Sequence, residues 1–123
     1  MDITSPNGST TQGIQTVLHP VTDLDAAKAV YSALLGVAPT SDAPYYVGFE
    51  AAGQQIGLVP NGASQGMTGP VAYWHVADIE AKIAEVVAAG AKIQEAAHDV
   101  GGGRLVATVT DPDGNVLGLL QDR

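Results

Sequence analysis

The sequence predicts an α+β fold made of two tandem βαβββ units, which form a curved mixed sheet around a cleft with the helices on the outer face. A strand, a helix and a hairpin occur in the same order in both halves, turn residues recur at matching points, and a Gly-rich linker separates the halves. We expect a disordered lead-in over residues 1–12 and one domain over 13–123. The units cover about 13–60 and 70–123, joined by a linker at 61–69.

The first unit begins with a strand over residues 14–21, followed by a helix. Asp23 suits the N-cap of this helix and Gly36 its C-terminal cap. Apolar residues recur at helical spacing and predict one inward face: Leu24, Ala27, Tyr31 and Leu34. A short loop follows between two prolines, and residues 45–50 and 54–60 then predict a hairpin.

The second unit repeats this order. Residues 71–77 predict a strand, Asp78 an N-cap, and Gly90 the end of a helix whose inward face contains Ile79, Ile83 and Val86. A strand at 91–97 leads to a glycine loop, Gly101–Gly103, which we expect to be mobile. Residues 104–110 and 116–121 form the last hairpin, joined by an Asp-Pro-Asp-Gly turn.

The two halves match position by position. The matching pairs are Asp23 with Asp78, Gly36 with Gly90, Gly53 with Gly114, and Ile56-Gly57-Leu58 with Leu117-Gly118-Leu119. We therefore expect each helix to cover one face of its own sheet, and the other faces to form the cleft.

Composition excludes several classes of function. The formal net charge of -8 repels nucleic acid and anionic lipid. The absence of cysteine excludes disulfides, thiolate metal sites and a cysteine nucleophile. No apolar run approaches the roughly 18–20 residues that span a membrane, and the N-terminus does not match a signal peptide. We expect a cytoplasmic protein that binds neither nucleic acid nor membrane.

Three stretches carry a family resemblance: VTDLDAAKAVYSALLG (21–36), HVADIEAKIAEVVAAG (75–90) and DPDGNVLGL (111–119). In this order they resemble the vicinal oxygen chelate superfamily, which includes glyoxalase I, extradiol dioxygenases, fosfomycin-resistance transferases and bleomycin-binding proteins. The resemblance covers the chain from about residue 14 onward. It implies the predicted fold, a small-molecule ligand and a homodimer.

The resemblance also locates the positions where metal-dependent members carry their ligands. Here those positions hold Thr16, Gly57, Val71 and Gly118, none of which is a strong metal ligand. We therefore expect no metal and no cofactor. Of the three histidines, we expect His19 under the helix, His98 at the surface and His75 in the cleft, although together they could form a non-standard site.

Strand alternation and the repeat together predict which residues line the cleft. Gly57 and Gly118 either make room for a ligand or allow the sheet to curve. Arg104 either pairs with an anionic ligand group or forms a surface salt bridge. The expected ligand-binding residues are Thr16, Leu18, Tyr45, Val47, Phe49, Gln55, Gly57, Tyr73, His75, Arg104, Val106, Thr108 and Gly118. A β-bulge in the first hairpin would place Tyr46 in the cleft instead of Tyr45.

Four functions compete. We favour metal-independent binding of a small organic molecule in the cleft. The second is a metal-independent isomerase or cyclase in which His75 or Tyr73 is the catalytic acid or base. A metal-dependent lyase or dioxygenase is disfavoured by the missing ligands. An interaction domain with a vestigial cleft is the fourth.

Overall fold

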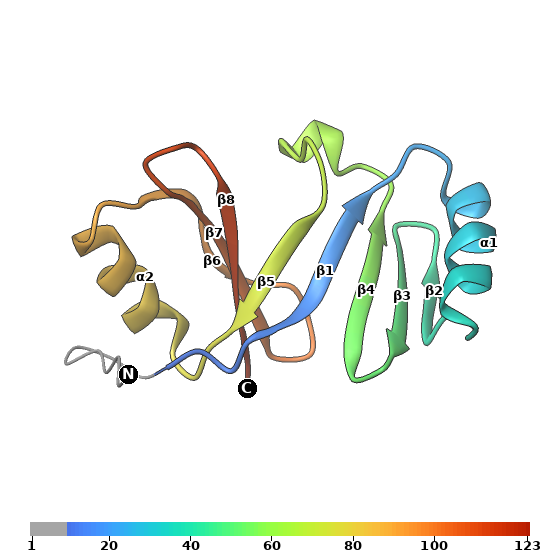
Figure 1. Ribbon diagram of the computed structural model, residues 1–123, viewed down its shortest axis with the longest axis horizontal. Helices are drawn as coiled ribbons and strands as arrows, with labels where there is room; N and C mark the ends of the chain where they lie inside the picture. The colour runs from blue at the N-terminus through green and yellow to red at the C-terminus, as the bar shows by residue number, and fades with distance from the viewer. Residues whose placement is uncertain (1–9) are drawn as a thin grey trace. The chain divides into compact units, whose positions relative to one another are not determined.

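The computed structural model describes residues 10–123 and confirms an α+β fold with two βαβββ units. One compact unit comprises residues 15–72, and the other comprises residues 73–123 together with residues 10–14 (Figure 1). Most of the expected lead-in lies outside the described residues. Within its described part, residues 10–12, the Gln12 amide donates to the His75 carbonyl, and the His75 amide donates to the carbonyl of Gly13 just after it. This end of the expected lead-in is therefore bound to a strand.

The first unit contains β1 (Ile14–Pro20), α1 (Leu24–Leu35), β2 (Ser41–Ala43), β3 (Tyr46–Ala51) and β4 (Gln54–Val59). The strand order is β2-β3-β4-β1, with β1 parallel to β4 and the other pairs antiparallel. β2 lies where the sequence predicted a loop between Pro39 and Pro44. Its three residues are too few to show alternation, and its pairing to β3 alone makes it a strand.

α1 covers one face of this sheet and closes the first core. Val47, Phe49 and Leu58 are at most 1% exposed. They pack with Leu24, Ala27, Tyr31 and Leu35 of the helix. The prediction that Leu34 faces inward is wrong. Leu34 is 74% exposed, and Leu35 packs against the core in its place. Leu35 lies eleven residues after Leu24, which is close to three full turns of an α-helix.

The second unit contains β5 (Val71–His75), α2 (Ile79–Ala88), β6 (Lys92–Asp99), β7 (Arg104–Thr110) and β8 (Val116–Asp122). The strand order is β5-β8-β7-β6, which repeats the order of the first unit. The short 3-10 helix Ala63–Gln65 lies in the predicted linker. None of the described helices is both long and apolar enough to cross a membrane.

α2 covers one face of the second sheet. The buried residues of this core are Val76, Ile79, Ile83, Ala107, Val109 and Leu119, and Trp74 packs against them as predicted. Asp78 accepts a hydrogen bond from the Ala81 amide at 3.1 Å, and Gln121 accepts one from the Ile79 amide at 2.8 Å. A side chain from β8 therefore helps to fix the start of α2.

β6 departs from regular pairing with β7 in two places. Ile93 lies opposite Val109 and Glu95 lies opposite Thr108. β6 therefore advances by two residues where β7 advances by one. A second shift places His98 opposite Val106. Each extra residue forms a β-bulge. The bulge changes the face of the sheet to which the side chains after it point.

Candidate functional site

We define the helix-free face of each sheet as the face that its own helix does not cover. On the second sheet, a row of residues crosses all four strands on this face. Tyr73 lies opposite Gly118, Gly118 opposite Thr108, and Thr108 opposite Glu95. Gly118 has no side chain, so the row presents polar groups on either side of a bare backbone position.

The polar groups of this row interact with one another. Tyr73 and Thr108 are each 7% exposed. The Thr108 hydroxyl donates to the Gln94 side-chain carbonyl oxygen at 2.9 Å. Burial raises the pKa of Tyr73, and the charge of Glu95 raises it further. Tyr73 therefore presents a neutral hydroxyl on the face that Glu95 also reaches.

A second row runs beside the first. His75 lies opposite Leu120, Leu120 opposite Val106, and Val106 opposite His98. His75 is 6% exposed. Burial lowers its pKa, Arg104 lowers it further, and Asp122 acts in the opposite direction. The His75 imidazole is therefore neutral near pH 7 and can accept or donate a hydrogen bond.

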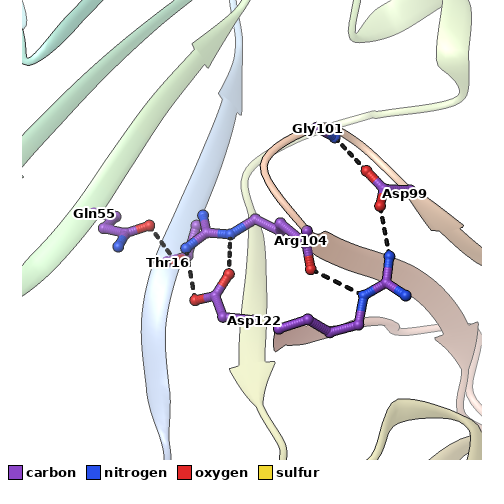
Figure 2. A network of polar contacts seen from close by, with 8 residues as sticks. Thr16, Gln55, Asp99, Gly101, Arg104 and Asp122 are labelled. Carbon is purple, nitrogen blue, oxygen red and sulfur yellow. Dashed lines mark hydrogen bonds and ion pairs between the residues drawn. The ribbon is translucent and has the colours of Figure 1, made fainter.

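Arg104 and Asp122 form the third pair on this face. The guanidinium donates to both carboxylate oxygens, at 2.7 Å from Nε and 3.0 Å from Nη2 (Figure 2). These hydrogen bonds lower the pKa of Asp122, and the charges of Arg104 and His75 lower it further. Of the two roles predicted for Arg104, the structure contains the salt bridge, so its positive charge is already matched by a carboxylate.

On the first sheet, four of the predicted residues share the helix-free face. Thr16 lies opposite Gln55, and Leu18 opposite Gly57. The Thr16 hydroxyl donates to the Gln55 side-chain carbonyl oxygen at 3.3 Å (Figure 2).

Tyr46 occupies the space above Gly57. A Cβ built on Gly57 would overlap the Tyr46 hydroxyl and would lie 2.5 Å from Leu18 Cδ2. A Cβ on Gly48 would lie 3.0 Å from the Tyr46 ring. Gly48 and Gly57 are paired across β3 and β4, so the ring lies over two adjacent glycines. Here glycine permits the close approach of the Tyr46 side chain, which is neither of the two roles predicted for Gly57.

Three predicted residues are not on the helix-free face. Val47 and Phe49 pack under α1, and Tyr45 precedes β3 with 75% exposure. The prediction transferred the register of the second hairpin to the first by matching Gly53 with Gly114. The first hairpin closes with Ala51 opposite Gln54, whereas the second closes with Thr110 opposite Val116. The shorter turn shifts the register by one residue, and a shift of one reverses the face.

The other two histidines lie where the sequence placed them. His19 is under α1, with Nδ1 3.3 Å from the Tyr31 hydroxyl, and burial lowers its pKa. His98 is at the surface, and its Nε2 lies 3.1 Å from Glu95 Oε1.

The sequence missed three residues of these faces, Gln94, Glu95 and Asp122, and it offered Tyr46 only as the alternative to Tyr45. Gln94 and Glu95 reach the helix-free face through a β-bulge, and no glycine or proline in residues 91–97 marks it. Asp122 follows from continuing the alternation of β8 beyond residue 121. Tyr46 follows from the register of the first hairpin.

One broad surface hollow lies at the start of α1. It contains none of the predicted site residues, and three of its lining residues are aspartates. Its lining consists of Thr22, Asp23, Leu24, Asp25, Asp42, Ala43 and Pro44.

The residues at the expected metal positions do not fit a metal. Thr16 alone of the four has a side-chain donor atom, and its hydroxyl is bonded to Gln55. Within residues 10–123, no group of three His, Cys, Asp or Glu side chains is arranged to hold an ion. The donor set therefore provides no basis for a step that runs through a metal.

The sequence profile of the Glyoxalase/Bleomycin resistance protein/Dioxygenase superfamily matches residues 13–119. The chain therefore belongs to this superfamily, as its motifs predicted. A search of curated protein sequences finds no significant match.

Solved structures with the same fold are distant in sequence. Hypothetical protein BH1468 from Bacillus halodurans C-125 is 16% identical, with a TM-score of 0.75 over 94% of this chain and 96% of that one. Methylmalonyl-CoA epimerase from Mycobacterium tuberculosis is 18% identical, with a TM-score of 0.70 over 98% and 93%. The Mn(II)-bound glyoxalase from Novosphingobium aromaticivorans is 22% identical, with a TM-score of 0.68 over 91% and 39%. Such identities establish the fold alone.

Proposed function

We propose that this protein binds a small organic molecule on the helix-free face of its second sheet, without a metal. The observation that carries the proposal is the row formed by Tyr73, Gly118 and Thr108, in which two buried hydroxyl groups flank a position with no side chain. Apolar residues beside the row, including Val106 and Leu120, suit the body of an organic ligand. A mostly apolar surface with a few fixed polar groups is typical of small-molecule sites.

A fragment screen observed by NMR tests this proposal. We expect binders that shift the amide signals of Tyr73, Thr108 and Gly118. Thr108→Val should weaken such binders by about tenfold, because it removes one hydrogen bond at constant shape. Tyr73→Phe, which removes the other hydroxyl of the row, should weaken them as well. Its control is Tyr45→Phe, which removes a hydroxyl from a side chain that is 75% exposed. Binders that act only on other residues would contradict the proposed site.

Metal independence is tested separately. The purified protein would be dialysed against a chelator, and its metal content would be measured by plasma mass spectrometry. We expect unchanged fragment binding and less than a stoichiometric amount of metal. Stoichiometric metal that survives dialysis would refute this part of the proposal, and His19, His75 and His98 would then be tested as ligands.

A second candidate is metal-independent proton transfer on the same face. The specific observation is the lowered pKa of His75, which leaves the imidazole able to accept a proton at neutral pH. The raised pKa of Tyr73 favours it as a proton donor rather than as a base. An identified binder would be incubated with the protein in deuterated water. Deuterium incorporation that is lost in His75→Ala, while binding is kept, would support an isomerase.

A further inference from the structure

The two β-bulges of β6 gather polar side chains at the edge of the Tyr73–Thr108 row. In a regular strand, adjacent residues point to opposite faces. Here Gln94 bonds to Thr108, while the charge of Glu95 acts on Tyr73, so both neighbours reach the same face. The second bulge brings His98 opposite Val106, on the same side as Glu95. Bulges of this kind commonly redirect side chains next to functional sites.

The Glu95 carboxylate lies beside the His98 ring and has the capacity to bind a ligand. His98 Nδ1 lies 3.0 Å from the Ala96 carbonyl oxygen, which can only accept, so this nitrogen donates. Nε2 of the same ring lies 3.1 Å from Glu95 Oε1. A carboxylate accepts about four hydrogen bonds, and the His98 ring takes at most one of them, in the form that carries a proton on both nitrogens. The Glu95 side chain is 54% exposed, so a ligand can reach its oxygens from solvent.

Two basic side chains lie on this face, Arg104 and Lys92. The chain has five Lys and Arg residues. Four of these are paired with carboxylates: Lys28, Lys82, Arg104 and Arg123. The fifth, Lys92, lies opposite Thr110, which is two residues along β7 from Thr108, the residue opposite Glu95. An anionic ligand would meet Glu95 and an Arg104 already bound to Asp122, whereas a cation would meet an accessible carboxylate.

We propose that the ligand of this face is a small amine, whose protonated nitrogen is bound by the Glu95 carboxylate and whose apolar body lies over Gly118 and Val106. This inference rests on the proposed function and names its ligand class. The net charge of -8 favours the approach of a cation over that of an anion. Tyr73, Thr108 and Gln94 provide further hydrogen bonds to the same molecule.

Three probes of matched shape test the inference: benzylamine, benzyl alcohol and benzoate. Their affinities would be measured by NMR titration against wild type, Glu95→Gln and Glu50→Gln. Glu95→Gln keeps the shape of the side chain and removes its charge. Glu50→Gln is the control, since it removes an equal charge from an exposed side chain in the other unit.

We expect benzylamine to bind wild type about tenfold more tightly than the alcohol or benzoate, as a charge-assisted hydrogen bond would produce. Glu95→Gln should reduce the affinity for benzylamine to that for benzyl alcohol, whereas Glu50→Gln should leave the affinity for benzylamine unchanged. Raising the NaCl concentration should weaken the binding of benzylamine and leave that of benzyl alcohol unchanged.

Two outcomes would overturn the inference while the proposed function stands. In the first, benzoate binds the Tyr73–Thr108 row as well as benzylamine does. In the second, benzoate binds and loses affinity in Lys92→Gln, which would make Lys92 the recognition group. A broad fragment screen in which molecules of neither charge bind this face would instead refute the proposed function, and the inference with it.

Discussion

At the scale of single residues, the contact of Tyr46 with Gly57 shows how a missing side chain is used. We predict that Gly57→Ala lowers the free energy of unfolding by about 1–3 kcal/mol, because the new methyl group would overlap the Tyr46 hydroxyl and Leu18. The cost should be smaller in a Tyr46→Ala background. Chemical denaturation measures both values. Gly69→Ala is the control, since no atom lies within 4 Å of a Cβ there. Equal costs at Gly57 in both backgrounds would contradict the packing.

His19 and His75 make the stability of the protein depend on pH. Burial lowers the pKa of both side chains from the ordinary value of 6.5. As the pH falls below that value, the unfolded chain binds protons that the folded chain does not, so stability falls. The loss continues until the pH reaches the lowered folded values, below which both states are protonated.

The expected result is a lower melting temperature at pH 5.5 than at pH 7.5. Replacing His19 by Asn should reduce this difference, because the variant has one fewer group whose pKa differs between the two states. Thermal unfolding at several pH values checks the prediction. An unchanged pH dependence in both His19→Asn and His75→Asn would show that other groups cause it.

At the scale of elements, the turn between β3 and β4 fixes the register of the first sheet. Ala52 and Gly53 have φ values of 53° and 77°, so both central residues are left-handed, as in a type I′ turn. Alanine is disfavoured there and asparagine is preferred. We predict that Ala52→Asn stabilises the protein by about 0.5–1 kcal/mol, whereas Gly53→Ala destabilises it. Urea unfolding of the two variants should therefore shift in opposite directions.

The glycine loop after β6 is attached at its base. Asp99 accepts from the Gly101 amide at 2.6 Å and from the Arg123 guanidinium at 2.7 Å (Figure 2). We predict that Asp99→Ala increases the hydrogen-exchange rate of the Gly101 amide and leaves that of the Val109 amide unchanged. Fast exchange of Gly101 already in wild type would support the expected mobility of the loop.

At the scale of the whole molecule, 13 acidic residues oppose five basic ones. Repulsion among surface carboxylates opposes the compact state, and salt screens it. We predict that raising NaCl from low to moderate concentration increases the melting temperature by a few degrees. Calorimetry checks this, and a decrease would show that the ion pairs outweigh the repulsion. The homodimer expected from the family resemblance stays a prediction, which sedimentation equilibrium would check.

Much of the fold could be predicted because its signals are local. Asp23 and Asp78 cap the two helices as expected, and the last hairpin lies where its turn residues placed it. On the second sheet, the predicted residues Tyr73, His75 and Thr108 do share one face. On the first sheet, the residues predicted on β1 and β4 share the helix-free face as well. On β3 of that sheet, Val47 and Phe49 were assigned to the wrong face. The register of the first hairpin differs by one residue from that of the second, and a shift of one residue moves every side chain of a strand to the opposite face.

The sequence by itself determined the family, the duplicated βαβββ order and the absence of ligating side chains at the usual metal positions. These depend on residue identity and spacing, which one chain displays in full. The tertiary structure alone decided that Arg104 is bound to Asp122, that Tyr46 covers Gly57, and that a bulge brings Glu95 opposite Thr108. Each of these depends on which strands pair and in what register, and strand pairing joins residues far apart in the chain.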